Sequence, residues 1–172
     1  IIVETGIIAD TSRICWDLRP RLRFPTRETR VMDCCTTMED ALRLAALNQC
    51  LLRMLYRLRC ANQRWRMYSH LLLGENRWRA MRYATDAGLL DLGQQRIVPF
   101  PELLEELIAL VREDAEALGC VAEIEGLREI LQRGTSAHRQ VRIYDEALQA
   151  GATESEALTA GVDWLVAETA RI

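Results

Sequence analysis

Hydrophobic and polar residues alternate near the start of the chain, which is the pattern of a β-strand. The period of two over residues 14–18 predicts one strand. Pro20 ends this strand, because proline has no N–H to donate to a neighbouring strand. The β-branched residues of segment 26–32 predict a second strand. Two strands alone do not form a stable sheet, so we expect them to complete a larger sheet whose other strands come from elsewhere.

After residue 37 the apolar residues recur every three or four positions, which is the spacing of amphipathic helices. Gly119 is an expected helix end and Gly74 an expected break. Thr153 and Glu156 form a capping box, which marks the start of the final helix. The predicted helices cover residues 37–59, 62–84, 101–119, 122–133, 136–150 and 153–170, and a short hairpin covers 89–98.

These elements predict an α+β protein that is mostly helical and forms one domain overall. Residues 1–36 would be the strand pair, and residues 37–172 a helical region with a short hairpin near 88–98. The apolar share of 49% and the charged share of 27% are typical of a soluble globular protein. No apolar run approaches the roughly 18 residues of a membrane span. Residues 1–8 contain Glu4 and no basic residue, so we do not expect them to be a secretion signal. We therefore expect a cytoplasmic protein with no membrane segment.

Six cysteines and two histidines lack the spacing of a zinc site, so we expect reduced thiols, as in cytosolic proteins. The net charge of −3 conceals a basic first part, because residues 1–100 contain 16 arginines against 10 acidic residues. Arginine binds phosphate and carboxylate through two parallel hydrogen bonds, so this part suits an anionic ligand. The alternative is the codon usage of a GC-rich genome, since the chain contains no lysine. We expect no nucleic acid, because no recognition motif appears.

The second predicted strand contains candidate site residues. Glu28 and Arg30 are two positions apart, so their side chains share one face of the strand, and Asp17 and Arg19 do the same on the first strand. A face with these charges cannot be a dry core unless the charges pair. One interpretation is a site in which Glu28 binds a divalent cation and the arginines bind phosphate. The alternative is a solvated face with salt bridges.

Five short motifs follow one another along the chain: WDLRP at 16–20, TRETRVMD at 26–33, ENRWRAMRY at 75–83, GTSAHRQ at 134–140 and VDWLV at 162–166. In this order they resemble the bacterial carboxylate–amine ligases of the glutamate–cysteine ligase type 2 family. The resemblance covers essentially the whole chain and implies the C-terminal half of such a ligase, as a subunit, a fragment or a degenerate relative. One departure is Ala84, where the family usually has glycine.

The family has the glutamine synthetase-like catalytic fold, in which the concave face of an antiparallel sheet binds ATP and magnesium. The resemblance implies that Glu28 is a magnesium ligand and that Arg30 contacts the transferring phosphate or the substrate carboxylate. Arg19 would be a second phosphate-side cation, and Asn76 and Arg77 would reach the nucleotide from a helix. The family's Glu-x-Glu metal strand belongs to an N-terminal half, which we expect as another segment or subunit, and hence we expect an oligomer.

The implied activity is the ATP- and magnesium-dependent formation of an amide from a glutamate-like carboxylate and an amine, through an acyl phosphate. The rival function is a non-catalytic helical scaffold or assembly subunit derived from the same fold. The presence of Glu28 and Arg30 favours the ligase, whereas the missing N-terminal half favours the scaffold.

Other polar residues allow two interpretations each. Asn76 and Arg77 lie amid an apolar helix face, where they would either reach the site or make a helix–sheet contact. Thr135 and Ser136 would either present backbone N–H groups to an anion or act as a plain N-cap, with Ser136 as the expected cap. His138 would be either a general base or an ordinary exposed helix residue.

Overall fold

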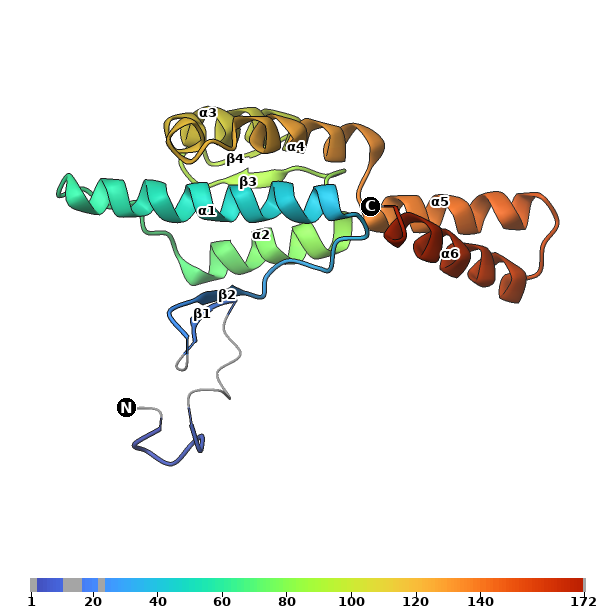
Figure 1. The fold of residues 1–172 in the computed structure, drawn as a ribbon, viewed down its shortest axis with the longest axis horizontal. Helices are drawn as coiled ribbons and strands as arrows, with labels where there is room; N and C mark the ends of the chain where they lie inside the picture. The colour runs from blue at the N-terminus through green and yellow to red at the C-terminus, as the bar shows by residue number, and fades with distance from the viewer. Residues whose placement is uncertain (1–2, 11–16, 22–23, 172) are drawn as a thin grey trace. The chain divides into compact units, whose positions relative to one another are not determined.

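Figure 1 shows the fold of the 172-residue chain in a computed structural model. The structure describes residues 3–10, 17–21 and 24–171. The chain divides into two compact units, Ile1–Cys34 and Cys35–Ile172. The expected boundary after residue 36 lies close to this division, and the assignment of both parts to one domain stays a prediction.

The first unit contains a short antiparallel hairpin. Strand β1 is Leu18–Pro20 and strand β2 is Arg27–Thr29, with Arg19 directly opposite Glu28. A strand pair was predicted here, but β1 shares only Leu18 with the predicted segment 14–18, and β2 is shorter than its predicted segment 26–32. The predicted strand residues 14–16 lie outside the described part of the chain.

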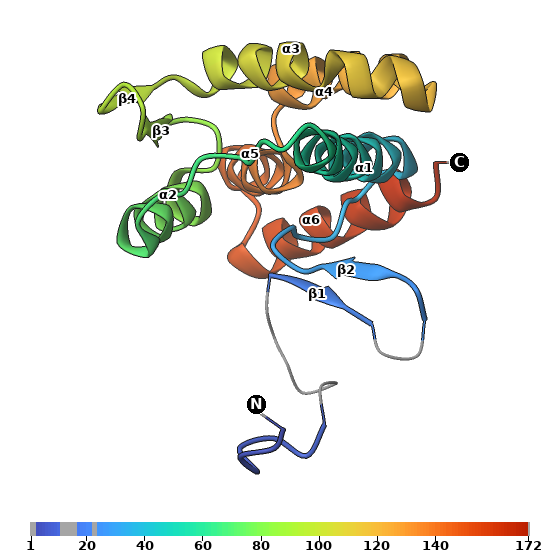
Figure 2. The same ribbon diagram turned by 90° about the vertical axis from the view of Figure 1, so that its left-hand side faces the viewer.

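Three helices form the core of the second unit: α1 (Met38–Cys60), α3 (Phe100–Leu118) and α4 (Val121–Arg133). Each helix contacts the other two, and Figure 2 shows the three packed together. Gly119 ends α3 in the left-handed conformation with φ 70°, which confirms its predicted role. The buried core residues are Ala46, Cys50, Leu104, Ile108, Val111, Ala115, Ile124 and Leu127.

A fully buried acid joins α1 to α3. Asp114 on α3 accepts a hydrogen bond from Arg53 Nη1 at 2.5 Å and another from Arg57 Nη2 at 2.9 Å. The Asp114 side chain is 0% exposed. The hydrogen bond from Arg57, aided by Arg53, nevertheless lowers the pKa of Asp114 against the effect of burial. The buried charge is tolerated because both arginines neutralise it.

Helix α2 (His70–Tyr83) contacts strand β3 (Leu89–Asp91), which pairs with β4 (Arg96–Val98). The predicted hairpin near 88–98 is therefore confirmed. Two main-chain hydrogen bonds of Leu90 go to the side chain of Asn76, which fixes the hairpin to the helix.

The predicted helix over residues 62–84 begins too early. Asn62 follows α1 with φ 56°, a left-handed conformation that interrupts the helical backbone, and helix resumes only at His70. Gly74, the expected break, lies inside α2 and does not end it. A glycine inside a helix costs about 1 kcal/mol relative to alanine, which the contacts of the surrounding helix can offset.

Helices α5 (Ser136–Gln149) and α6 (Glu154–Thr169) form a helical hairpin. The predicted capping box at Thr153 is confirmed. The expected cap of α5 is wrong by one residue, because the side chain of Thr135, and not that of Ser136, accepts the capping hydrogen bond. A Thr hydroxyl one position before the first helical residue has the geometry that capping needs.

The secondary structure agrees with a mostly helical α+β protein, since six helices accompany two two-stranded sheets in the described part of the chain. Among residues 3–10, 17–21 and 24–171, the search for a helix with the length and apolar character of a membrane span found none. The larger sheet that β1 and β2 are expected to complete stays a prediction.

The turn after α2 provides a first test of the structure. The Asp86 N–H donates to the Tyr83 carbonyl at 2.9 Å, and Ala84 has φ 47° and ψ −116°. This is the conformation of the first central residue of a type II′ turn, which favours glycine because a Cβ is strained there. We predict that Ala84→Gly raises the free energy of unfolding by about 1 kcal/mol, measured from denaturant midpoints.

Ala80→Gly is the matched control, because Ala80 lies inside the same helix on its exposed side. This change should lower the free energy of unfolding by about 1 kcal/mol. Equal losses of stability in both variants would contradict the assigned turn.

The buried ion cluster predicts a pH dependence. Unfolded aspartate titrates near about 3.9, and the pKa of Asp114 is lower in the folded chain. Its stabilising contribution is therefore complete above about pH 4 and is lost as the pH falls through the folded pKa. Asp114→Asn should lower the free energy of unfolding at neutral pH by on the order of 2–4 kcal/mol and flatten the acid side of the stability curve.

Glu113→Gln is the control for this experiment. Glu113 is the neighbouring acid on α3 and pairs with the same Arg57 at 3.1 Å, but its side chain is 66% exposed. Exposed pairs contribute roughly 0–1 kcal/mol. A Glu113→Gln variant as unstable as Asp114→Asn would show that burial is not the decisive feature of Asp114.

Candidate functional site

Three arginines surround one carboxylate on the hairpin of the first unit. Arg19 Nε donates to Glu28 Oε2 at 2.8 Å, and Arg30 Nε donates to Glu28 Oε1 at 2.9 Å. Arg21 Nε lies 3.1 Å from Glu28 Oε2. The hydrogen bond from the Arg30 N–H to the Asp17 carbonyl, 2.7 Å long, continues the strand pairing up to this residue. We call Arg19, Arg21, Glu28 and Arg30 the arginine cluster.

The arginine cluster follows from the register of the hairpin. Residues directly opposite each other in an antiparallel pair point to the same face, and Arg19 is opposite Glu28. Arg21 lies two positions after Arg19, and Arg30 lies two positions after Glu28, so the period of two places both on that face as well. The structure thus brings the predicted residues Arg19, Glu28 and Arg30 together, and adds Arg21, which the same periodicity would have identified.

The electrostatics of the arginine cluster suit an anion. The hydrogen bond from Arg19 lowers the pKa of Glu28, and the hydrogen bond from Arg30 and the charge of Arg21 lower it further. This side chain is therefore a carboxylate near neutral pH. Three guanidinium groups thus converge on one carboxylate. The side chains of Arg21 and Arg30 are 52% and 45% exposed, whereas that of Arg19 is 9% exposed. A phosphate or carboxylate from solution can therefore reach two of the three cations.

The arginine cluster fits magnesium less well than it fits an anion. Magnesium is usually held by one or two carboxylates together with phosphate oxygens and water. Glu28 supplies one carboxylate, and both of its oxygens already accept from arginines. Among the residues that the structure describes, no group of three or more His, Cys, Asp or Glu side chains is placed to hold a metal ion. These residues do not by themselves form a metal site.

The other two predicted ligand-binding residues lie on α2 of the second unit. Asn76 Nδ2 donates to the Leu90 carbonyl at 2.8 Å, and the Leu90 N–H donates to Asn76 Oδ1 at 2.7 Å. The amide of Asn76 thus makes the helix–sheet contact that was the alternative interpretation. Arg77 is an exposed residue of the same helix. A role of either residue in nucleotide binding stays a prediction.

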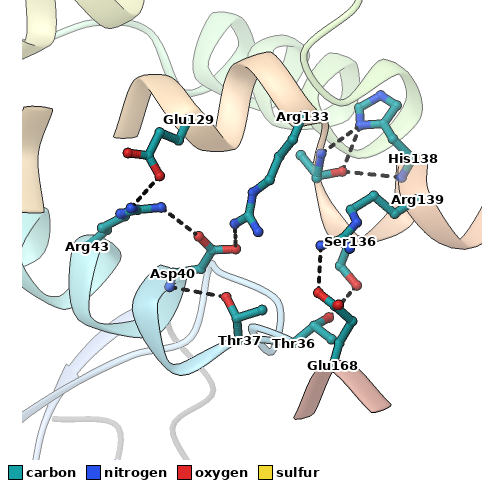
Figure 3. Close-up of polar contacts among 11 residues, drawn as sticks. Thr36, Thr37, Asp40, Arg43, Glu129, Arg133, Ser136, His138, Arg139 and Glu168 are labelled. Atoms are coloured by element: carbon teal, nitrogen blue, oxygen red, sulfur yellow. Dashed lines mark hydrogen bonds and ion pairs between the residues drawn. The ribbon is translucent and has the colours of Figure 1, made fainter. Parts of the chain in front are cut away.

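A second set of polar contacts connects α1 with α4 and α5 in the second unit, as Figure 3 shows. Asp40, in the first turn of α1, pairs with Arg43 at 3.5 Å and also with Arg133 at the end of α4. The Thr36 and Ser136 hydroxyl oxygens are 2.5 Å apart, which connects the starts of α1 and α5. Sequence reasoning did not identify the Asp40–Arg133 and Thr36–Ser136 contacts, because their partners are 93 and 100 residues apart and follow no periodicity.

His138 belongs to the cap of α5. Its Nδ1 accepts from the Thr135 N–H at 3.1 Å and lies 2.8 Å from Thr135 Oγ1. A backbone N–H can only donate, so Nδ1 is the acceptor in this contact. Nε2 lies 3.3 Å from Asp86 Oδ2. The capping role accounts for Nδ1, and a signature of threonine followed three residues later by histidine would have indicated it.

The hairpin and the helices together make an α+β protein. Comparison with known proteins identifies its family. The model of glutamate–cysteine ligase family 2 (GCS2) matches residues 2–159. The chain belongs to this family, as its motifs indicated.

Curated relatives agree with this assignment. A protein of Rhodospirillum rubrum named "Putative glutamate--cysteine ligase 2" is 56% identical over 169 residues, which are 98% of this chain and 43% of that protein. A protein of the same name from Paracoccus denitrificans is 51% identical over 171 residues, 99% of this chain and 46% of that protein. One from Chloroflexus aurantiacus is 38% identical over 169 residues, 98% of this chain and 41% of that protein. The chain thus spans less than half the length of these relatives.

Proposed function

We propose that this chain is the helical C-terminal half of an ATP- and magnesium-dependent carboxylate–amine ligase with a glutamine synthetase-like catalytic fold. The arginine cluster carries the proposal, because two exposed guanidinium groups beside a buried one are suited to phosphate. Membership of glutamate–cysteine ligase family 2 supports the ligase class. Glutamate, or a similar acid, and cysteine, or another amine, are the proposed substrates.

The proposed reaction has two steps. A carboxylate oxygen of the acid attacks the γ-phosphorus of ATP, ADP leaves, and an acyl phosphate forms. The amine nitrogen then attacks the acyl carbon, phosphate leaves with the C–O electron pair, and an amide remains after the nitrogen loses a proton. The protein's contribution to such a reaction is mostly positioning and charge neutralisation. Arg30 would contact the transferring phosphate or the substrate carboxylate, and Arg19 would add positive charge on the phosphate side.

Glu28 has two roles in this proposal. It orients the arginines, as the contacts of 2.8–3.1 Å indicate, and in the complete ligase it would contribute one oxygen to magnesium. Magnesium, when bound, would neutralise charge on the ATP phosphates. Its remaining ligands would come from outside the described residues, because these contain no group of three or more His, Cys, Asp or Glu side chains placed to hold a metal ion.

We also propose that a second segment or subunit completes the sheet. Strands of three residues such as β1 and β2 are too short and too few to be stable alone. Unpaired edge N–H and C=O groups cost roughly 1–3 kcal/mol each when buried. The relatives are long enough to supply further strands, since this chain matches only 43% of one and 46% of another. An assembly of this chain with the remaining part of a ligase is therefore the proposed active form.

Two measurements test the proposal, and the first uses the chain alone. We predict no robust magnesium-dependent phosphate release by the 172-residue chain with ATP, glutamate and cysteine, because one carboxylate is too few for the metal ions of such a site. Robust turnover by this chain alone would exclude the half-site proposal.

The second measurement adds the other half. We expect co-expression with the unmatched part of the Rhodospirillum rubrum relative to produce a complex with magnesium-dependent ATP turnover. In that complex Arg30→Ala should reduce kcat by on the order of 10²–10³, because a charge that stabilises the transition state is lost. Glu28→Gln should weaken ATP binding, which isothermal titration calorimetry measures.

Arg27→Ala is the matched control, because Arg27 is an exposed arginine of the same strand on the alternate face. It should leave kcat within a few-fold of the parent chain. Equal losses in Arg27→Ala and Arg30→Ala would show that the arginine cluster is not the site. If the complex is stable but binds no ATP, the alternative function, a non-catalytic scaffold or assembly subunit, is the correct one.

A further inference from the structure

Two cysteine sulfurs touch inside the second unit, and the proposed ligase site uses neither. Cys50 Sγ, on α1, lies 3.5 Å from Cys120 Sγ, in the turn between α3 and α4. Cys50 is 0% exposed, whereas Cys120 is partly exposed. Sulfurs joined by a disulfide are about 2.05 Å apart, so a shift of roughly 1.5 Å in the two side chains would allow the bond to form.

We propose that Cys50 and Cys120 are a dithiol–disulfide pair, oxidised by low-molecular-weight disulfides and reduced by the corresponding thiols. The packing of α1 against α3 and α4 already holds the two cysteines in position. Cys50 lies one turn before Arg53, whose guanidinium pairs with Asp114 on α3, and both cysteines pack in the same hydrophobic core. The two sulfurs are therefore held together before any oxidation, and closing the bond requires little further ordering of the chain.

The reaction proceeds by two thiol–disulfide exchanges. The Cys120 thiolate attacks one sulfur of glutathione disulfide, the S–S bond of that molecule breaks, and one glutathione thiolate leaves. The Cys50 thiolate then attacks the Cys120 sulfur of the mixed disulfide, and the second glutathione thiolate leaves. Two protein protons pass to the two released thiolates. The protein loses two electrons to glutathione disulfide, which becomes two molecules of glutathione.

The different exposure of the two cysteines indicates which thiolate attacks first. Cys120 is partly exposed and meets the soluble disulfide first, while Cys50 is inaccessible and attacks from the interior. Burial raises the pKa of Cys50 to about 12, helped by its contact with Cys120 and by the charge of Asp114, and opposed by Arg53. The attacking species is the thiolate, so the second exchange is the slow one and accelerates as the pH rises.

Oxidation would connect α1 covalently to the α3–α4 turn. The loop closed by the bond spans the residues from 50 to 120, and a disulfide across a loop of this length stabilises mainly by restricting the unfolded chain. This consequence concerns the helical scaffold only and does not depend on ATP, magnesium or any ligase activity.

The test is oxidation of the full 172-residue chain with glutathione disulfide, followed by peptide mapping without reductant. Trypsin cleaves after arginine, so Cys50 falls in the peptide 44–53 and Cys120 in the peptide 113–128. We expect these two peptides to be joined, and their combined mass to be lower by two hydrogen atoms. The melting temperature of the oxidised chain should rise by about 5 °C or more and return to its starting value with dithiothreitol.

Three variants separate this pair from the other thiols. Cys120→Ser should abolish the linked peptide and the shift in melting temperature, and Cys50→Ala should stop the reaction at the mixed disulfide with glutathione. Cys60→Ser is the matched control, because Cys60 is an exposed cysteine of the same helix α1, and it should leave both results unchanged. Cys50→Ala removes a buried side chain and can prevent folding. In that case the peptide map of the parent chain is the deciding measurement.

The proposal is wrong if peptide 44–53 remains unlinked under oxidation that fully converts the exposed thiols. It is also wrong if Cys34, Cys35 or Cys60 appears in the linked peptides in place of Cys120. A disulfide that forms between Cys50 and Cys120 but leaves the melting temperature unchanged would retain the redox pair and exclude its stabilising effect.

Discussion

The ion cluster of Asp114 with Arg53 and Arg57 is the constraint on which the helical unit depends. A carboxylate that is 0% exposed is very unfavourable unless cations lie against it. Both cations come from α1, one turn apart, and the acid comes from the C-terminal part of α3. Because a shift of one helix along the other would separate the buried acid from its cations, the cluster favours the observed register. Apolar packing alone would tolerate small shifts along the helix axes.

The pairing of a carboxylate with arginines has a different effect in the first unit. Glu28 is also a carboxylate among arginines, but its side chain is 24% exposed and two of its partners are about half exposed. Water already solvates these charges, so the pairing adds little stability. It does hold the arginines in one orientation, with the Arg21 and Arg30 side chains partly exposed to solvent. A group that organises cations at an accessible surface is suited to recognition of an anion.

Local signals in the sequence predicted most helices, because a cap or a glycine acts within one turn. Thr153 and Gly119 are examples, and both are confirmed. The region after Cys60 was predicted wrongly, because the left-handed conformation of Asn62 leaves no pattern in the apolar residues. At the candidate site, the period of two placed Glu28 and Arg30 together. The ion cluster and the contact of Cys50 with Cys120 were not predictable, since they depend on how distant helices align.

Ion pairs between helices explain part of the excess of arginine in residues 1–100. The basic residues of α1 meet acids of the second half, since Arg43 pairs with Glu129, Arg53 with Asp114, and Arg57 with both Asp114 and Glu113. Much of the excess of arginine before residue 100 is therefore neutralised inside the helical unit, which requires no ligand.

The arginine cluster differs because Arg19, Arg21 and Arg30 all pair with one carboxylate, that of Glu28. In the helical unit, four arginines of such pairs meet four carboxylates: Arg43, Arg53, Arg57 and Arg133 pair with Asp40, Glu113, Asp114 and Glu129. Ion pairs between helices account for Arg43, Arg53 and Arg57 of α1, whereas at β1 and β2 three arginines converge on one partly exposed acid, an arrangement suited to an anionic ligand.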